Sequence, residues 1–277
     1  MVFSDSHAHM VDYSPEQVKK IVGLMAKKKV EFVLAVGVNL ESSEGTVKLA
    51  EIYREIKAAI GFHPWFAAEL NDKDKQRFEK LAGSKYVRAI GEVGLDYAPP
   101  GGPGAGTPPP DMPKMDFPKN MPPMPKTPPS REVQKELFSY EVSIAQKHGL
   151  PLNIHCMGGA HQDMMSILKP AVRNGVTAMA HSFEGDLKML RDWLDLGFYI
   201  VLGEKQVIKE PLADLENIIR TTPLDKLIVE TDANPMHSPN GPVDVIPVVE
   251  KIAAIRGAAA EEMGMATTAN LKRVLKL

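Results

Sequence analysis

The chain has 277 residues, and its 33 Lys and Arg nearly balance its 35 Asp and Glu, which gives a formal net charge of −2. This balance excludes a protein that holds nucleic acid mainly through a broad basic surface. The single cysteine, Cys156, excludes an internal disulfide framework, and no apolar run approaches a membrane span. The N-terminus has no basic segment followed by an apolar stretch, so we expect no secretory signal and a cytoplasmic location.

The first predicted element is a strand over residues 2–9, which carries Asp5, His7 and His9 at alternating positions. Because a strand points side chains i, i+2 and i+4 to one face, it would aim one carboxylate and two imidazoles into the same space. This pattern is typical of a strand that begins a metal site. A chance pair of histidines on a polar edge strand is the alternative, and the rest of the chain decides between them.

Short β-rich apolar runs and helical patterns alternate along the rest of the chain. A helix is predicted after Ser14, where Pro15 and Gln17 complete an N-terminal capping pattern. Further helical patterns cover residues 44–55, 131–147, 161–173, 187–196 and 212–220. Strands are expected over residues 2–9, 32–38, 58–63, 87–96, 152–156, 177–183, 198–203 and 227–232. Eight strands that alternate with helices predict a parallel sheet, and eight repeats are enough to close a barrel.

One segment interrupts this alternation. Residues 98–130 carry 13 of the 23 prolines, a composition that predicts polyproline II structure or disorder. Without this segment, the chain is close to the ~250 residues of a (β/α)8 barrel. We therefore predict one α/β domain over residues 1–277, a (β/α)8 TIM barrel with a Pro-rich insertion in the loop after the fourth strand. The insertion is either a tolerated surface loop or a loop over the active site, because such loops surround the mouth of a barrel.

Polar side chains end several of the predicted strands, where the carboxyl ends of barrel strands converge on one mouth. Beside the group on the first strand, they are His63, Glu92, Asp96, His155, His181 and Asp232. Five of the eight histidines are at such strand ends. A single buried histidine is usually a packed core residue, but several at one mouth together with carboxylates predict a metal site.

The motifs that carry these residues are D-x-H-x-H, G-x-H-P, G-E-x-G-L-D, the histidines of NIHC and AHSF, and E-T-D near the C-terminal end. Together they resemble the TatD-related metal-dependent hydrolases, within the wider amidohydrolase-type barrels. The segments QKELF and ATTANLKRVL are also similar, so the resemblance covers nearly the whole chain in the expected order. It implies a barrel with one or two metal ions that hydrolyses phosphodiester bonds of DNA, often from a 3′ end.

The resemblance also implies a role for each residue at the mouth. The expected metal ligands are His7, His9, Glu92, His155, His181 and Asp232. Glu92 would bridge the two ions and Asp232 would accept a proton from the attacking water, so these two are the expected catalytic residues. His63 would face the scissile phosphate. Asp5 and Asp96 would orient ligands, because a metal-bound histidine normally donates its other N–H to an acceptor.

The charge of this ligand set supports phosphate chemistry independently. Four neutral imidazoles and two carboxylates carry −2, so two divalent ions would leave the site at +2 and attract an anionic phosphate without a basic surface. A metal-activated water would attack the phosphorus in line. Imidazole and carboxylate ligands suit Zn, Mn, Fe or Ni, and Mg is less natural at the histidines. The expected cofactors are therefore two divalent ions of open identity.

Other functions compete with a monomeric nuclease that acts on DNA and does not bind a membrane. The same metal site would also suit a small phosphoester, an amide or a lactone. An interaction protein that docks a polyproline-reading partner through residues 98–130 is the second alternative. Trp65 and Phe66 either stack on a base or close a barrel loop. Cys156 points away from the face of His155 in a regular strand, which favours a buried thiol.

Overall fold

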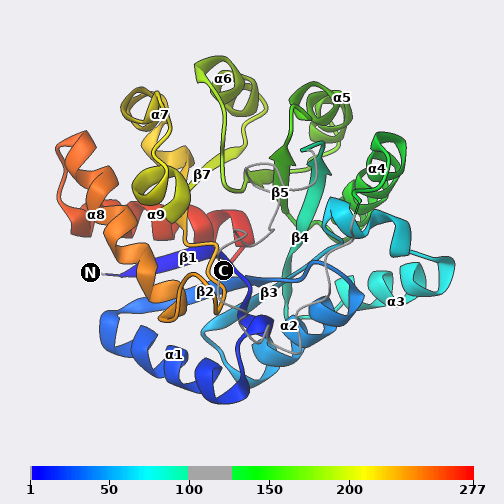
Figure 1. The fold of residues 1–277 in the computed structure, drawn as a ribbon, viewed down its shortest axis with the longest axis horizontal. Coiled ribbons are helices and arrows are strands. Elements are labelled where there is room, and N and C mark those ends of the chain that lie inside the picture. The colour runs from blue at the N-terminus through cyan, green and yellow to red at the C-terminus, as the bar shows by residue number, and fades with distance from the viewer. Residues whose placement is uncertain (1, 99–126) are drawn as a thin grey trace.

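The computed structural model describes residues 2–98 and 127–277. Within these residues, eight parallel strands form one sheet in the order β1 to β8, which confirms the predicted (β/α)8 TIM barrel (Figure 1). The strands are β1 (Phe3–Ala8), β2 (Val30–Val36), β3 (Ile56–Ile60), β4 (Val87–Asp96), β5 (Leu152–Met157), β6 (Ala178–Ala180), β7 (Tyr199–Gly203) and β8 (Leu227–Glu230). The α-helices are α1 (Pro15–Lys28), α2 (Leu40–Ile52), α3 (Asp72–Ala82), α4 (Arg131–His148), α5 (His161–Val172), α6 (Leu187–Asp195), α7 (Leu215–Thr221), α8 (Val245–Arg256) and α9 (Ala260–Leu275).

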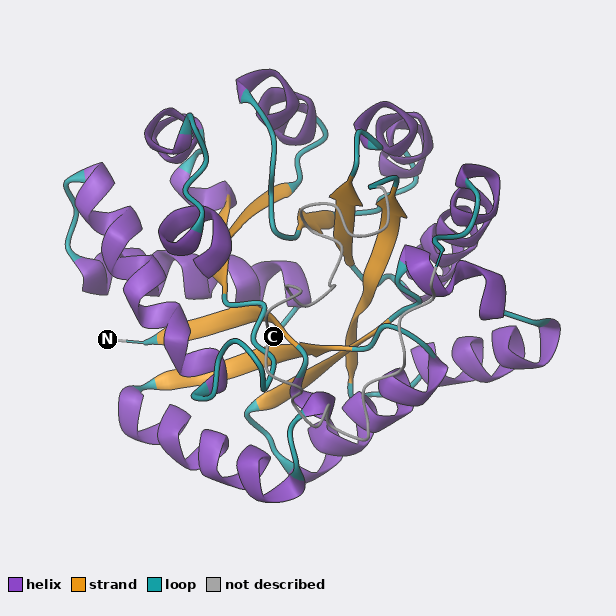
Figure 2. Cartoon of the chain, in the orientation of Figure 1, coloured by secondary structure: helices purple, strands orange, loops and turns teal. Residues whose placement is uncertain are grey.

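The helices surround the strands (Figure 2), and the barrel has two apolar cores. The larger core lies between the helices and the outward-facing side chains of the strands. The smaller core fills the barrel with inward-facing side chains such as Phe32 and Tyr199, together with Leu271 and Leu275 from α9. Phe32 and Tyr199 lie near the amino ends of their strands, so α9 covers the end of the barrel opposite to the mouth.

Helix α9 also packs on the first strand, so segments far apart in the sequence meet at this end of the barrel. The hydroxyl of Ser4 donates a hydrogen bond to Thr268 Oγ1 at 3.1 Å, across 264 residues of sequence. Gly264 provides room for this contact, because a Cβ atom at this position would come within 2.9 Å of the Phe3 ring. The C-terminal helix therefore fixes the place of β1, from which the first histidines project.

The start of α1 follows the predicted capping pattern: Gln17 N donates to Ser14 Oγ, and Ser14 N donates to Gln17 Oε1. The second predicted helix begins earlier than residue 44, because Asn39 caps α2 at Leu40 and forms a capping box with Ser42. Helices α3, α8 and α9 were absent from the prediction. In α3 only Phe78 and Ala82 are buried, so its apolar stripe is too thin to recognise in the sequence.

Four strands end before the site residue predicted at their carboxyl end, so that residue lies in the segment that follows. Strands β1, β3, β6 and β8 end at Ala8, Ile60, Ala180 and Glu230, not at residues 9, 63, 183 and 232. The backbone explains two of these ends, because Ser182 has φ 47° and Asp232 has φ 58°, a left-handed conformation that no strand continues.

The loop after β3 has a different cause. A 3-10 turn over Pro64–Glu69 follows His63, and Pro64 has no N–H to donate to a ladder. Between β4 and α4, residues 99–126 lie outside the described residues, so most of the predicted insertion at 98–130 does too. Its domain boundary and its role stay predictions. In the described part of the chain, no helix is long and apolar enough to cross a membrane.

Asp5 joins β1 to β8, where the barrel closes through a parallel bridge between Ala8 and Ala233. Its Oδ1 accepts hydrogen bonds from the backbone N–H groups of His7 and Thr231, each at 3.0 Å, and its Oδ2 accepts one from the Thr231 hydroxyl. The prediction that Asp5 contacts a histidine ring is wrong. Asp5 acts on His7 through the main chain instead.

Replacing Asp5 with Ala should destabilise the protein by ~3 kcal/mol, because buried donors lose their acceptor. Urea unfolding of the two proteins measures this difference. Ser4→Ala is the matched control on the same strand, since it removes one hydroxyl contact at the opposite end of the barrel and should cost less. Equal losses for Asp5→Ala and Ser4→Ala would contradict the closing role of Asp5.

A second buried carboxylate lies behind the loop after β3. Glu141 of α4 is fully buried, its Oε1 accepts a hydrogen bond from Phe62 N at 2.7 Å, and its Oε2 has no partner among the described residues. Burial raises the pKa of Glu141 well above its usual value. The folded protein therefore keeps a proton that the unfolded chain releases, so rising pH favours unfolding.

We expect Glu141→Gln to remove this pH dependence. Between the ordinary glutamate pKa and the raised one, wild-type stability should fall by up to about 1.4 kcal/mol per pH unit relative to the variant. Urea unfolding at pH 5, 7 and 9 measures the difference between the two proteins. Parallel pH profiles for the variant and the wild type would show that Glu141 is ionised in the fold.

Candidate metal centre

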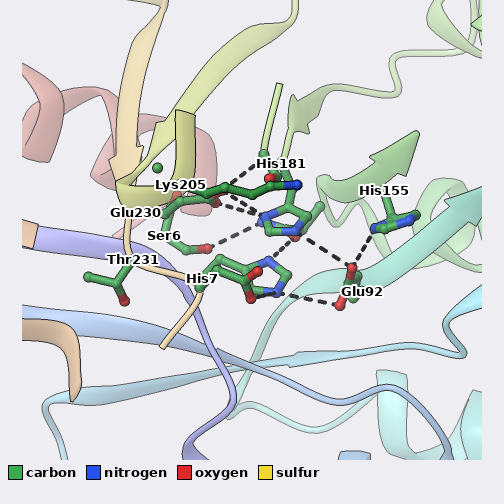
Figure 3. A network of polar contacts seen from close by, with 12 residues as sticks. Ser6, His7, Glu92, His155, His181, Lys205, Glu230 and Thr231 are labelled. Atoms are coloured by element: carbon green, nitrogen blue, oxygen red, sulfur yellow. Dashed lines mark hydrogen bonds and ion pairs between the residues drawn. The ribbon is translucent and has the colours of Figure 1, made fainter. Parts of the chain in front are cut away.

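The histidines predicted at the mouth converge on one carboxylate, that of Glu92 in β4. Figure 3 shows His7, His155 and His181 around Glu92. The nearest nitrogen of each surrounding histidine lies within 3.9 Å of a Glu92 oxygen; these residues are His7, His9, His63, His155 and His181. Glu92 is buried, so its charge is held in a site with little water. The sequence therefore placed these residues at the correct mouth.

The first group joins β1 to the loop after β8. His9 Nε2 and His7 Nε2 lie 3.2 and 3.7 Å from Asp232 Oδ1, and His7 Nε2 lies 3.5 Å from Glu92 Oε2. Two donor atoms that each bind one ion at ~2.1 Å are roughly 3–4 Å apart. His7, His9 and Asp232 are therefore close enough to share one ion.

The second group contacts the other oxygen of Glu92, although its His181 ring stacks on the His7 ring with the ring centroids 3.6 Å apart. His155 Nδ1 and His181 Nε2 lie 2.8 and 3.6 Å from Glu92 Oε1, whereas His7 and His9 are nearest to Oε2. The two oxygens of one carboxylate thus face two different histidine groups. This is the arrangement expected of a carboxylate that lies between two ions.

Two buried carboxylates hold the rings of the second group. Asp96 Oδ2 lies 3.3 Å from His155 Nε2 and also accepts a hydrogen bond from Trp65 Nε1 at 2.7 Å. Glu230 Oε2 lies 2.9 Å from His181 Nδ1, and burial raises the pKa of Glu230 to about 8. When the outer nitrogen of each ring carries the proton, the other nitrogen has a lone pair that faces Glu92.

His63 has the opposite orientation. Its Nδ1 accepts a hydrogen bond from Trp65 N at 3.3 Å, so its Nε2, 3.7 Å from Glu92 Oε1, carries the proton. Burial and the neighbouring His155 lower the pKa of His63 to about 3, which keeps the ring neutral. His63 therefore presents a hydrogen-bond donor to the centre and not a lone pair. This supports the expected contact with a phosphate oxygen more than a ligand role.

Two nitrogens in the site show that the donor set fits a metal ion. His7 Nε2 is buried and makes no hydrogen bond to any described residue, and the buried His155 Nδ1 has only Glu92 Oε1, at 2.8 Å, beside it among the described residues. A buried polar atom left unpaired costs about 1–3 kcal/mol. Burial lowers the pKa of His155, but the hydrogen bonds to Asp96 and Glu92 outweigh it and raise the pKa to about 10. The carboxylates thus attract positive charge at a place where a divalent ion would compete with protons.

Asp232 is the most accessible carboxylate of the predicted ligand set. Its side chain is 44% exposed, whereas that of Glu92 is 6% exposed. The left-handed turn at Asp232 places this side chain at the mouth, and its backbone N–H donates to His7 O at 3.0 Å. A water molecule or substrate can therefore reach Asp232 from the solvent.

The prediction gave no role to Asn153, Glu230 or Lys205. Asn153 lies 2.8 Å from the His7 ring, and Glu230 contacts His181. Each stands two positions before a predicted ligand, on a strand that is otherwise apolar, and this spacing was the available signal. Lys205 follows β7 in a π-helical turn, with its Nζ 2.6 Å from Glu184 Oε1, and Figure 3 labels it among the residues of this polar network.

Comparisons with known proteins find similar chains over nearly the whole length. The model of the family described as TatD related DNase matches residues 4–276. An uncharacterized metal-dependent hydrolase, YabD of Bacillus subtilis, is 28% identical over 99% of this chain and 98% of its own length. A protein named 3′-5′ ssDNA/RNA exonuclease TatD, from Pectobacterium carotovorum, is 27% identical over 95% of each chain.

Solved structures agree on the fold. The crystal structure of a TatD homologue from Escherichia coli, YjjV, matches with a TM-score of 0.80 at 22% identity, over 99% of this chain and 98% of that one. A TatD family hydrolase from Entamoeba histolytica matches with a TM-score of 0.78 at 17% identity, over 99% and 98% of the two chains. Both likenesses support the barrel architecture.

Proposed function

Since this chain belongs to the TatD related DNase family, whose motifs the sequence carries, we propose that it is a metal-dependent nuclease that hydrolyses phosphodiester bonds of DNA from a 3′ end. The observation that carries the proposal is the position of Glu92 between two groups of histidines. Relatives named as 3′-5′ exonucleases on single-stranded DNA and RNA support this choice of substrate.

In the proposed centre, His7, His9 and Asp232 would hold one divalent ion, His155 and His181 would hold a second, and Glu92 would be available to both. Zn, Mn, Fe and Ni suit these donors, and Mg suits them less well. When bound, two such ions polarise the phosphoryl oxygen, lower the pKa of water and stabilise the leaving oxygen.

Residues of the chain supply the proton transfer and the contacts with the phosphates. Asp232 accepts the proton of the attacking water, because its carboxylate is exposed at the mouth. His63 donates its Nε2–H to an oxygen of the scissile phosphate, since its Nδ1 is already engaged by Trp65 N. Lys205, whose ammonium group pairs with Glu184, adds a positive charge for the flanking phosphate. The attraction for DNA is thus local, as the net charge of −2 requires.

The experiment that tests this function is hydrolysis of an end-labelled single-stranded DNA oligonucleotide by the purified protein. Reactions contain Mn²⁺ or Mg²⁺, or a chelator, and the Glu92→Ala variant is the control. We expect shortening that needs the metal and that is lost in the variant, and the ladder of products gives the end that is attacked. A protein that contains metal but leaves the oligonucleotide intact would contradict the nuclease.

The small phosphoester, amide and lactone alternatives share the same centre, so the substrate separates them. Activity on a small phosphodiester without activity on the oligonucleotide would favour a small-molecule hydrolase. The interaction role of residues 98–130 stays a prediction, and deletion of that segment tests it. Unchanged hydrolysis and partner binding after the deletion would leave the segment with neither role.

A further inference from the structure

Asn153 is an unusual residue for the inside of this barrel. It lies in β5 between Leu152 and Ile154 and is fully buried, although asparagine is disfavoured in strands. Its amide bridges two positions of β1: Nδ2 donates to Ser6 O at 3.2 Å, and Oδ1 lies 2.8 Å from His7 Nδ1. Both polar ends of the side chain are therefore satisfied by the strand that carries the first histidines.

These two contacts fix the orientation of the amide and, with it, the proton on His7. A backbone carbonyl only accepts hydrogen bonds, so the NH2 group of Asn153 must face Ser6 O and the amide oxygen must face His7. Because that oxygen also only accepts, His7 Nδ1 carries the proton. The other nitrogen, Nε2, then has its lone pair directed between Glu92 and Asp232, at 3.5 and 3.7 Å from their nearest oxygens.

We infer that Asn153 is a positioning residue for the metal centre: it holds His7 in the tautomer that presents Nε2 as a ligand. The inference rests on the proposed metal site. His155 and His181 are held by carboxylates, Asp96 and Glu230, whereas His7 is held by a neutral amide.

There is a physical reason why the partner of His7 Nδ1 is a neutral amide. His7 already faces Glu92 and Asp232, and a third carboxylate behind its ring would add negative charge to a fully buried position. An amide orients the ring without this cost. Asn153 thus orients the His7 ring without adding charge, and the negative charge of the site comes from Glu92 and Asp232.

Two substitutions separate orientation from packing. Asn153→Leu keeps the volume and suits the apolar strand, but it removes the acceptor for His7 Nδ1. Asn153→Asp keeps an acceptor for His7, at some cost to the contact with Ser6 O. If the amide orients His7, calorimetric titration of the metal-free proteins with Mn²⁺ should show roughly 10- to 100-fold weaker binding for Leu and a smaller loss for Asp. A packing role predicts the opposite order, and that order would overturn the inference.

A second measurement needs no variant. In the metal-free protein with ¹⁵N-labelled histidine, two-bond ¹H–¹⁵N spectra distinguish Nδ1–H from Nε2–H tautomers, and His7→Gln assigns the signal. We expect Nδ1–H for His7 in the wild type and a mixture in Asn153→Leu. An Nε2–H tautomer in the wild type would overturn the inference. Wild-type protein that binds no metal would instead contradict the proposed function, so the two failures are distinguishable.

Discussion

Replacing Glu92 with Ala should reduce metal-dependent hydrolysis by roughly 10³-fold or more. One carboxylate lies against both histidine groups, with Oε2 nearest to His7 and Oε1 nearest to His155. Its removal takes a shared negative charge from a buried site that would hold two divalent ions. Turnover of an end-labelled oligonucleotide over a range of Mn²⁺ concentrations measures the loss.

The matched control for Glu92→Ala is Glu141→Gln, which changes another fully buried carboxylate outside the metal centre. Glu141 contacts the backbone of Phe62 and no predicted ligand, so the control should keep nearly all of the activity. Activity of Glu92→Ala within tenfold of the wild type would exclude the shared role of this carboxylate. Equal losses in both variants would indicate damage to the barrel.

Replacing Asp232 with Asn should lower kcat by ~10²- to 10⁴-fold, the range expected when a general base is lost. Asparagine keeps the shape of the side chain but cannot accept a full proton. Burial works against the charge of Asp232, but the hydrogen bond from His9 and the nearby His7 and His181 outweigh it and hold its pKa below the usual value. The carboxylate is therefore ionised at neutral pH, as a base must be.

Asp232 would also bind the first ion in the proposed centre, so kcat must be measured at saturating Mn²⁺ to separate proton transfer from metal affinity. A loss that disappears at high metal concentration would assign Asp232 to metal binding alone. Asp192→Asn is the control, because Asp192 pairs with His161 between the outer helices α5 and α6. This variant should leave kcat unchanged.

Much of the candidate site could be predicted from the sequence because its residues follow a simple spacing. Asp5 and His7 alternate along β1 and His9 directly follows it, while Glu92 and His155 lie within strands whose carboxyl ends must meet in a barrel. The order of the strands in a barrel therefore predicts that these residues meet at one mouth, although it does not give the distances between them.

The partners behind the ligands were harder to predict. Asn153 reaches His7 from a strand that is not adjacent to β1 in the sheet, and Glu230 reaches His181 from β8. These pairs depend on how the barrel curves, which no local pattern records. For the same reason Asp5 was expected beside a histidine ring, whereas its acceptors are used by backbone donors and by Thr231.

The ends of the elements were also difficult. Ser182 and Asp232 adopt a left-handed conformation that neither residue type requires, so the sequence does not mark where β6 and β8 stop. Helix α9 escaped prediction because its buried face includes small and polar residues, such as Thr267 and Asn270, beside Leu271 and Leu275, so it does not appear in the sequence as an apolar stripe. Tertiary packing decided both features.

The docking of α9 on β1 implies that the proposed metal centre forms late in folding. Ser4 contacts Thr268, and His7 lies only three residues further along the same strand, with His9 directly after the end of this strand. Contacts between such distant parts of a chain form late, because a long loop must close first. A newly made chain would therefore complete its ligand set only after its last helix has been synthesised and has docked. Binding of the metal would then indicate that the whole barrel has folded.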